Sequence, residues 1–556
     1  SSYWDVLLSS QYSLINISSA SEPIQGNTYA SQASTWNLKT PPDPDATGNL
    51  IFDTAHSVLQ NWPNTRYRNG HTVVPGIIPL GTLLYHGRHN HHFPNGSDWT
   101  SVDPEHSFLF CTHPCWQLTL VTTQPLNVLY FDGSSAAKMR GGSLDVQDLL
   151  LWGERKDDKA FSESERLEEL CKWVKQKGLG LDGFVRMEMD FEVMLCDFSP
   201  KGGLETVSFA RLANGAPPST TSPNFSAIQI EGSEEALAQS EHNHFPGETR
   251  IHLDLTRMVT LYDTGLAPSL VAPRAAAAKE YGRWGHRAAL PGIDPANVVA
   301  FRKRVEEAVK LGNKPQASGV DWVAMMNVIV KRYGTRLETL RYLLEMKPVA
   351  DDWSDLARKA FTQLDIMLTP YIPYDARSLN ETSEASAVYE MCGTSHTSYI
   401  GRRALRSMTK SERMLFSAIQ ETTKEICRVL VASWERGASA GISPKYQAYG
   451  ERIGDEELLE IWRNDVLGLM DWLDWSIWVR CPPTCGDEES CYLPTWPFFV
   501  RATTWRTFIF PDPYEAYDTS MRRNWIILIP WRSIDPFQCG SGSSRAHSVR
   551  PSSGPS

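Results

Sequence analysis

The sequence contains no apolar run of the ~18–20 residues that a helix needs to cross a bilayer. Its longest apolar stretches, such as residues 525–529, are only as long as a strand. An excess of positive charge is also absent, since 54 Lys and Arg against 65 Asp and Glu give a net charge of −11. Nucleic acid binding depends on neutralising phosphates with Lys and Arg. We therefore predict no membrane span and no nucleic acid partner.

Several familiar site motifs are missing as well. The chain has no Gly-x-Ser-x-Gly nucleophile elbow, no phosphate-binding loop and no dinucleotide fingerprint. The histidine-rich run at residues 89–92 has no Cys or carboxylate at a spacing that would complete a zinc site. We predict no metal centre and no permanently bound cofactor.

Cysteines and glycosylation motifs indicate the compartment. The chain has ten cysteines, an even number, together with 19 tryptophans. Such a composition with N-x-[ST] motifs favours an oxidising compartment, so we predict a secreted, disulfide-bonded glycoprotein, free or held at the cell surface. The disulfide candidates are Cys111, Cys115, Cys171, Cys196, Cys481, Cys485 and Cys491. The glycosylation candidates are Asn16, Asn95, Asn224 and Asn380.

Changes in composition and periodicity divide the chain into five regions. We predict a loop-like N-terminal extension (1–55), an α+β domain (56–265), a mostly helical domain (280–480), a disulfide-stapled segment (481–539) and a disordered tail (540–556). Within the second region, the Gly-, Ser- and Pro-rich stretch 201–245 is expected to be a long insertion. The fold class is therefore α+β.

Three long helices are predicted in the helical domain, over 353–368, from 409 to about 437, and 455–478. Apolar residues recur in each at intervals of three and four, which is the period of a helix with one buried face. The second begins with the capping box Thr409–Glu412, in which each side chain accepts from a backbone donor of the other residue. An earlier charged helix is predicted over 162–176.

Strands are expected at residues 82–85, 115–122 and 126–131, and the last two should form an antiparallel pair. Residues 185–198 alternate between apolar and polar side chains, which predicts one further strand with an apolar and an acidic face. The acidic face carries Glu188, Asp190 and Glu192. Their mutual repulsion would raise at least one carboxyl pKa, as in an acid–base site, or they lie on a solvated strand face.

Four short motifs follow one another in the predicted α+β domain. They are Tyr85–Gly87 at the end of a strand, Thr100–Glu105 at a strand-to-helix turn, Gln124–Leu126, and Gly180–Gly183 leading into the strand that carries Glu192. Their order resembles that of the ADP-ribosyltransferase superfamily. The rest of the chain resembles uncharacterised secreted proteins of filamentous fungi.

The resemblance implies an ADP-ribosyltransferase-like front domain that cleaves the nicotinamide–ribose bond of NAD, by transfer or by hydrolysis. A carboxylate beside the ribose would stabilise the oxocarbenium-like transition state. The implied catalytic residues are Glu192, His86, Ser101 and Glu188. The implied substrate-binding residues are Tyr85, Gly87, Arg88, Phe108 and Asp190. NAD would be a substrate here and not a resident cofactor.

Two alternatives from other classes stay open. A secreted glycoside hydrolase would use two of the carboxylates Glu188, Asp190, Glu192 and Asp132 as an acid–base pair, with a glycan as substrate. A non-catalytic surface protein would use none of them. A carboxylate pair beside exposed tryptophans would favour the first alternative, and a single buried acid near His86 would favour the nucleotide enzyme.

Overall fold

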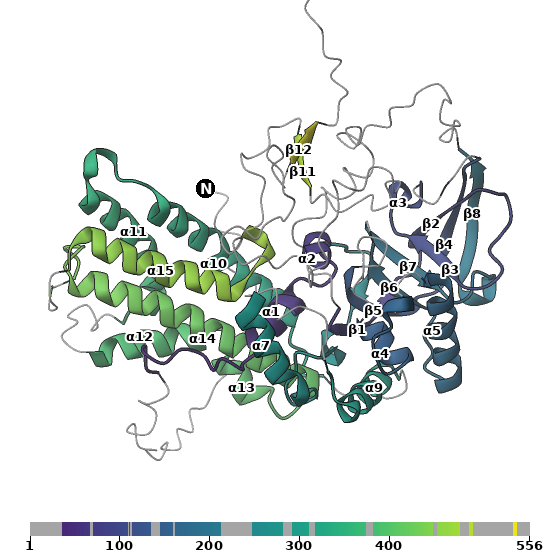
Figure 1. The fold of residues 1–556 in the computed structure, drawn as a ribbon, viewed down its shortest axis with the longest axis horizontal. Helices are drawn as coiled ribbons and strands as arrows, with labels where there is room; N and C mark the ends of the chain where they lie inside the picture. Colours follow the sequence, from purple (N-terminus) through teal and green to yellow (C-terminus); the bar gives the residue numbers. More distant parts are fainter. Residues whose placement is uncertain are drawn as a thin grey trace, which may run out of the picture.

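The computed structural model describes residues 36–66, 70–108, 111, 114–134, 145–159, 162–188, 190–212, 247–281, 292–310, 317–373, 382–446, 448, 453–478, 489–492 and 538–541. Over these residues the fold is mixed α+β, as predicted, with a sheet region and a helical region side by side (Figure 1). None of the helices in these ranges is long and apolar enough to cross a membrane.

A ten-stranded sheet forms the first region. Its strand order is β10-β1-β5-β6-β7-β3-β2-β4-β8, with β9 also paired to β1, and every pair is antiparallel except β5–β6. The predicted strands at 82–85, 115–122, 126–131 and 185–195 all contribute to this sheet. The strands are β1 (Thr72–Ile78), β2 (Leu83–Arg88), β3 (Asp98–Ser101), β4 (Trp116–Thr122), β5 (Leu126–Ser134), β6 (Gly183–Met187), β7 (Phe191–Leu195), β8 (Leu204–Arg211), β9 (His252–Leu253) and β10 (Val259–Thr260).

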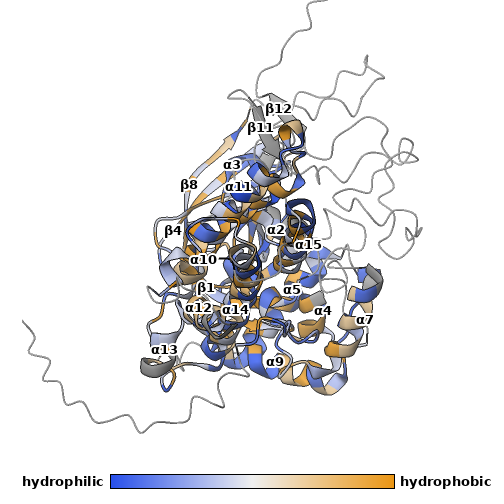
Figure 2. Ribbon diagram, turned by 90° about the vertical axis from the view of Figure 1, so that its left-hand side faces the viewer, coloured by the Kyte–Doolittle hydropathy of each residue, from blue (hydrophilic) through white to orange (hydrophobic). Residues whose placement is uncertain are grey.

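Both faces of the central strands are buried. One face packs against α4 (Asp145–Leu151), α5 (Glu163–Lys177) and α9 (Pro295–Val309), and Phe184 and Met194 belong to this smaller core. The other face contributes Val185 and Val193 to a larger core that continues into the helical region. Figure 2 shows that α4 and α9 carry hydrophobic and hydrophilic residues together, as expected for helices that cover a sheet.

The helical region is organised around α14 (Lys410–Ser439), the longest helix in the described part of the chain. It packs against α1 (Gly48–His56), α11 (Trp353–Leu368), α12 (Thr382–Thr394) and α15 (Asp455–Leu473). A further long helix, α10 (Trp322–Glu345), packs on α11 and α15. The remaining α-helices are α2 (Asn61–Arg66), α3 (Pro104–Phe108), α7 (Val271–Tyr281) and α13 (Ser398–Arg403).

The helices predicted from periodicity are close to those observed. Helix α11 spans 353–368 and α5 spans 163–177, while the third predicted helix ends at Leu473 and a short 3₁₀ turn follows. The predicted capping box begins α14, with Thr409 Oγ1 accepting from the Glu412 backbone N–H and Glu412 Oε2 accepting from the Thr409 N–H at 2.8 Å.

Two sequence predictions about the strands are wrong. Residues 185–198 form no single strand, because the chain reverses at 188–190 and β6 and β7 make a hairpin. The predicted pairing of β4 with β5 does not occur, since β4 lies between β2 and β8, and β5 lies between β1 and β6.

Two stretches predicted to lack regular structure contain it. Strand β8 lies inside the predicted insertion at 201–245, and as an edge strand it is exposed on most of its length, so it lacks an apolar stripe. Helix α1 begins inside the predicted extension, and all nine of its residues are buried. The rest of that extension before residue 36, and the predicted tail beyond residue 541, lie outside the described residues.

Three disulfides connect described residues: Cys111–Cys115, Cys171–Cys196 and Cys392–Cys427. The first two use predicted cysteines, whereas the last was not among the candidates. Cys491 lies in β11 (Glu489–Tyr492), in antiparallel register with Cys539 of β12 (Gln538–Ser541), and Cys481 and Cys485 lie outside the described residues. These bonds are compatible with a secreted protein.

Of the four predicted glycosylation sites, Asn95 lies on an exposed loop between β2 and β3. Asn16, Asn224 and Asn380 lie outside the described residues. The loop position of Asn95 is one that a glycan could occupy without displacing the core.

Candidate functional site

The three strands that carry Tyr85, Ser101 and Glu192 lie next to one another. Tyr85 of β2 pairs with Ser101 of β3, and Ser101 pairs with Glu192 of β7. Directly opposed residues of antiparallel strands point to the same face, so these three side chains form one row. His86 follows Tyr85 on the strand and points to the other face, where its ring meets Phe198. His86 and Glu192, both implied as catalytic residues of one site, therefore lie on opposite faces of the sheet.

Glu192 is 2% exposed and forms a buried ion pair with Arg186 of β6. Arg186 also donates to Glu163 at the start of α5, at 2.7 Å. Burial raises the pKa of Glu192 above its ordinary value, and the Arg186 charge partly opposes that rise. The carboxylate thus lies between the sheet and α5, and its counter-charge is Arg186 of the neighbouring strand β6.

The other residues of the predicted NAD site make contacts within the fold. Ser101 Oγ donates to the Asp103 carbonyl oxygen at 2.6 Å and lies 3.5 Å from the Tyr85 carbonyl oxygen. At Gly87 a Cβ would lie 2.0 Å from the Ser107 carbonyl oxygen, so the glycine is needed for the close approach of α3. Arg88 is half-buried on β2.

Phe108 is the last residue of α3, and its side chain lies outside the part that the structure describes. Asp132, a candidate of the glycosidase alternative, accepts from the Thr72 backbone N–H at 2.7 Å through Oδ1. The binding role of Phe108 therefore stays a prediction. Asp132 has a structural contact with the backbone of Thr72.

His86 is buried against the backbone of Trp99 and the ring of Phe198. Its Nδ1 is 2.5 Å from the Trp99 carbonyl oxygen, so this nitrogen carries the proton, and Nε2 lies 3.5 Å from Asp98 Oδ2. Burial lowers the pKa of His86, although Asp98 and the Trp99 carbonyl act in the opposite direction. The imidazole is accordingly neutral near pH 7.

Glu188 and Asp190 lie in the turn between β6 and β7, at the edge of the sheet next to α3. The Asp190 backbone N–H donates to His106 Nδ1 at 3.1 Å, which places the imidazole proton on Nε2. That nitrogen faces Glu188 Oε2 at 3.3 Å, and all three residues are buried. The two carboxyl groups therefore lie on a turn packed against a helix, and not on a solvated strand face.

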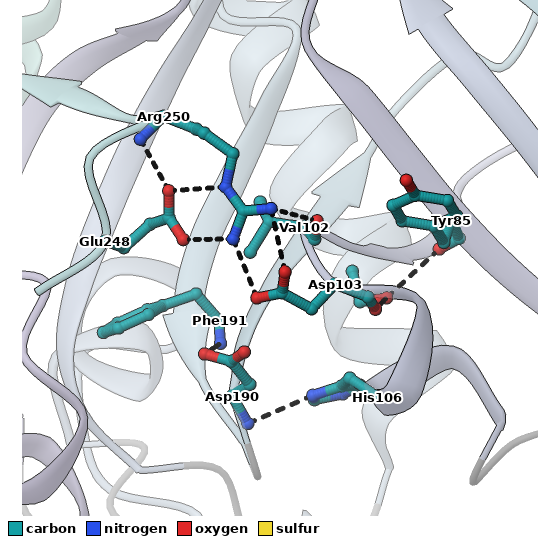
Figure 3. Close-up of polar contacts among 9 residues, drawn as sticks. Tyr85, Val102, Asp103, His106, Asp190, Phe191, Glu248 and Arg250 are labelled. Carbon is teal, nitrogen blue, oxygen red and sulfur yellow. Dashed lines mark hydrogen bonds and ion pairs between the residues drawn. The ribbon is translucent and has the colours of Figure 1, made fainter. Parts of the chain in front are cut away.

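A second group of charges completes the site beside this turn (Figure 3). Arg250 donates to both carboxyl oxygens of Asp103, at 2.9 and 2.7 Å, and to both oxygens of Glu248, at 2.8 and 2.6 Å. Burial disfavours the charged guanidinium, yet these bonds outweigh it and raise the pKa of Arg250. Arg250 thus joins Asp103 and Glu248 through charge-assisted hydrogen bonds.

Asp190 is the acid in this group that favours the protonated state. It is 1% exposed, and burial raises its pKa well above the ordinary value, with further contributions from a hydrogen bond to Asp103 and from the charges of Asp103 and Glu248. Two carboxyl groups that share a hydrogen bond cannot both be ionised. Asp103 and Asp190 therefore hold one proton between them.

The site opens to solvent through Asp103 and Arg250, whose side chains are 22% and 37% exposed. Asp190 lies beneath them. We call Asp103, Asp190, Glu248 and Arg250, with His106 and Glu188 beside them, the acid cluster. Within one hydrogen-bonded group it contains a protonated acid in the Asp103–Asp190 pair, a second carboxyl oxygen that can accept a proton, and the fixed positive charge of Arg250. These are the groups that general acid–base catalysis uses.

Sequence reasoning found Asp190 and Glu188 but missed most of their partners. Asp103 was assigned only to the start of a helix, and α3 does begin at the next residue, Pro104. Glu248 and Arg250 come more than 140 residues after Asp103, beyond a predicted insertion, and no local spacing connects them. The one available signal was an alternating, strand-like run at residues 250–256 that begins at Arg250 and follows Glu248 by two residues.

Comparison with known proteins gives relatives but no function. The family described as YPL277C N-terminal domain matches residues 115–231. The uncharacterized protein YOR389W of Saccharomyces cerevisiae (strain ATCC 204508 / S288c) is 23% identical over 542 residues, covering 80% of this chain and 81% of that protein. The uncharacterized protein YPL277C of the same strain is 30% identical over 199 residues, covering 27% of this chain and 40% of its own length.

No solved structure matches the chain. The comparisons do not confirm the resemblance to ADP-ribosyltransferases, which stays a prediction. The family match includes β6, β7 and their turn, with Glu188 and Asp190, and ends before Glu248 and Arg250.

Proposed function

We propose that the chain is a hydrolase of glycosidic bonds that works by general acid–base catalysis in the acid cluster. The supporting observation is the carboxyl pair Asp103–Asp190, which shares a proton while Arg250 holds Asp103 toward its ionised form. Cleavage of an acetal needs a proton for the leaving oxygen and a nearby carboxylate for the developing positive charge. It needs no metal and no nucleophilic Ser or Cys.

In this proposal Asp103 meets the substrate, because it is the carboxyl of the pair that solvent can reach. Asp190 is a positioning residue that stores the proton and passes it to Asp103 through their hydrogen bond. Proton transfer from Asp103 to the glycosidic oxygen lets the bond between that oxygen and the anomeric carbon break, and the Asp103 carboxylate stabilises the positive charge that develops on the sugar. Water then adds to the anomeric carbon and returns a proton to the pair, so that Asp103 and Asp190 again share one proton. Arg250 and Glu248 fix the orientation of Asp103, and His106 fixes the backbone of Asp190.

The NAD-consuming enzyme remains a second proposal, favoured by one observation. Tyr85, Ser101 and Glu192, which come from motifs of the resemblance, form a row across three adjacent strands. Against it, the ion pair with Arg186 neutralises Glu192 beneath α5. The acid cluster is the better supported site because one of its acids is accessible to solvent.

The test is turnover of a panel of aryl glycosides and polysaccharides, and separately of NAD, by wild type and by Asp103→Asn. We expect glycoside turnover to fall by about 10²–10⁴-fold in the variant. The matched control is Asp158→Asn, which changes an exposed Asp and should leave turnover unchanged.

Asp190→Asn gives a second readout. Its turnover should decline at a lower pH than that of wild type, because Asp103 beside Arg250 then loses its proton without the store that Asp190 provides. Full activity of Asp103→Asn, or an unaltered pH profile in Asp190→Asn, would contradict the proposal. Turnover of NAD that depends on Glu192 and not on Asp103 would support the second proposal instead.

A further inference from the structure

A local excess of positive charge distinguishes one segment of the helical region. The segment spans residues 399–413 and connects α13 with the first turn of α14. Its basic residues are Arg402, Arg403, Arg406, Lys410 and Arg413. Because the whole chain carries a net charge of −11, this excess is opposite in sign to the charge of the molecule as a whole.

The exposed cations of this segment have no acidic partner. Its one acidic residue, Glu412, is buried and accepts a hydrogen bond from Trp322 Nε1 at 3.1 Å. Arg406, Lys410 and Arg413 are exposed, and none of them forms an ion pair with a described residue. Their charges are therefore open to a partner outside the chain.

Two of these cations oppose the local stability of the helix. Lys410 is the first residue of α14 and Arg413 is the fourth. The first turn of a helix is the positive end of its dipole, where acidic side chains stabilise the helix and basic side chains destabilise it. The stability of α14 therefore does not account for Lys410 and Arg413, which indicates a role at the surface.

Exposed apolar side chains accompany the charges. Tyr399 is 55% exposed and Leu405 is 44% exposed. Arg413 Nη1 donates to the Leu405 carbonyl oxygen at 3.4 Å, so a cation and an apolar side chain lie together. Arg304 of α9 donates to Ser411 Oγ at 3.1 Å and adds a positive charge beside the start of α14. Helix α13 itself lies at the edge of the molecule in Figure 2.

We propose that this basic surface, made of Tyr399, Leu405, Arg406, Lys410 and Arg413, docks the protein on an anionic lipid membrane. Anionic headgroups supply the opposite charge, and each Lys or Arg near such a bilayer strengthens binding by about fivefold. The bilayer interface also favours Tyr and Leu side chains that stand beside cations. A soluble polyanion would use the cations alone and gain nothing from the exposed leucine.

The experiment is sedimentation of the full chain with vesicles of phosphatidylcholine, with and without phosphatidylserine. We expect binding only where phosphatidylserine is present. Added sodium chloride should weaken it, because salt screens the attraction between exposed charges. The triple variant Arg406→Gln, Lys410→Gln, Arg413→Gln should bind about 10²-fold more weakly than wild type. It should melt no lower than wild type, since these cations do not stabilise α14.

The matched control removes three exposed cations from other helices, by Lys172→Gln, Arg358→Gln and Lys359→Gln. Both triple variants change the net charge by the same amount, so the control should keep its vesicle binding. Equal loss of binding in the two variants would overturn the proposal, as would equal binding of wild type to both kinds of vesicle. If the variant of the basic surface melts well below the control, its cations serve the fold and the proposal is also overturned.

Leu405→Gln separates a membrane from a soluble acidic polymer. Loss of the apolar side chain should weaken vesicle binding by about tenfold and leave binding to heparin, a soluble polyanion, unchanged. If vesicle binding is unchanged in this variant while heparin competes with the vesicles, an acidic polymer is the partner and the membrane proposal is refuted. The acid cluster shares no residue with the basic surface, so neither proposal depends on the other.

Discussion

Replacing Glu192 by Gln tests whether this carboxylate serves stability or chemistry. The substitution keeps the shape and an acceptor for Arg186 Nε, and it removes the negative charge from a buried ion pair. Breaking such a pair typically costs about 3–5 kcal/mol, because the remaining charge is left in a medium of low polarity. Here Glu163 still neutralises part of the Arg186 charge, at 2.7 Å.

We therefore expect a loss near the lower limit, about 3 kcal/mol. In a large domain each kcal/mol shifts the melting temperature by about 2–4 °C, so Glu192→Gln should melt roughly 6 °C or more below wild type. The matched control is Glu165→Gln on the adjacent helix α5, which removes an exposed partner of Lys159 and should cost less than about 1 kcal/mol.

The assay is calorimetric melting of the two variants at pH 7, together with turnover on the substrate panel described above. If Glu192→Gln melts within the range of the Glu165→Gln control, the ion pair does not stabilise the fold. A simultaneous loss of NAD turnover would then assign Glu192 to catalysis, as the resemblance to ADP-ribosyltransferases implies. We expect Glu192→Gln to be less stable than wild type and to retain glycoside turnover.

Three further predictions concern other parts of the fold. The pKa of Asp190 is raised by folding, so its contribution to stability is complete below the ordinary carboxyl pKa and is lost as pH rises through the folded value. Denaturant titrations at several pH values should show this decline in the free energy of unfolding of wild type and not in that of Asp190→Asn. If the free energy of unfolding falls equally with pH in both proteins, the shared proton is refuted. Replacing both Cys171 and Cys196 by Ala opens a loop closed across 25 residues and should lower the free energy of unfolding by about 3 kcal/mol in the same assay. A loss below about 1 kcal/mol would show that this disulfide does not stabilise the fold. Thr409→Ala removes half of the capping box of α14 and should lower the free energy of unfolding by about 1 kcal/mol, whereas no change would mean that the cap is dispensable.

Local sequence determined the helices and the two-faced character of the strands. Apolar spacing of three and four residues placed α11 and α14, because the side chains that meet on a helix are close in the chain. The alternation at 185–195 correctly assigned Val185 and Val193 to one core and Met194 to the other face, even though the stretch is a hairpin. A reversal after an odd number of residues preserves that alternation, so periodicity alone could not reveal the turn.

The tertiary structure decided which strands pair and which charges meet. Strand partners are chosen by long-range packing, so β4 and β5, adjacent in the chain, lie in different parts of the sheet. Glu188 and Asp190 look like a solvated acidic face in sequence, yet α3 covers them and supplies His106. Asp103, Glu248 and Arg250 come together only when β3 and the segment before β9 fold to one edge. The sequence identified only Glu188 and Asp190 among the acids of this site. Because a carboxyl pKa depends on burial and on the nearest charges, only the fold determined that Asp190 holds a proton.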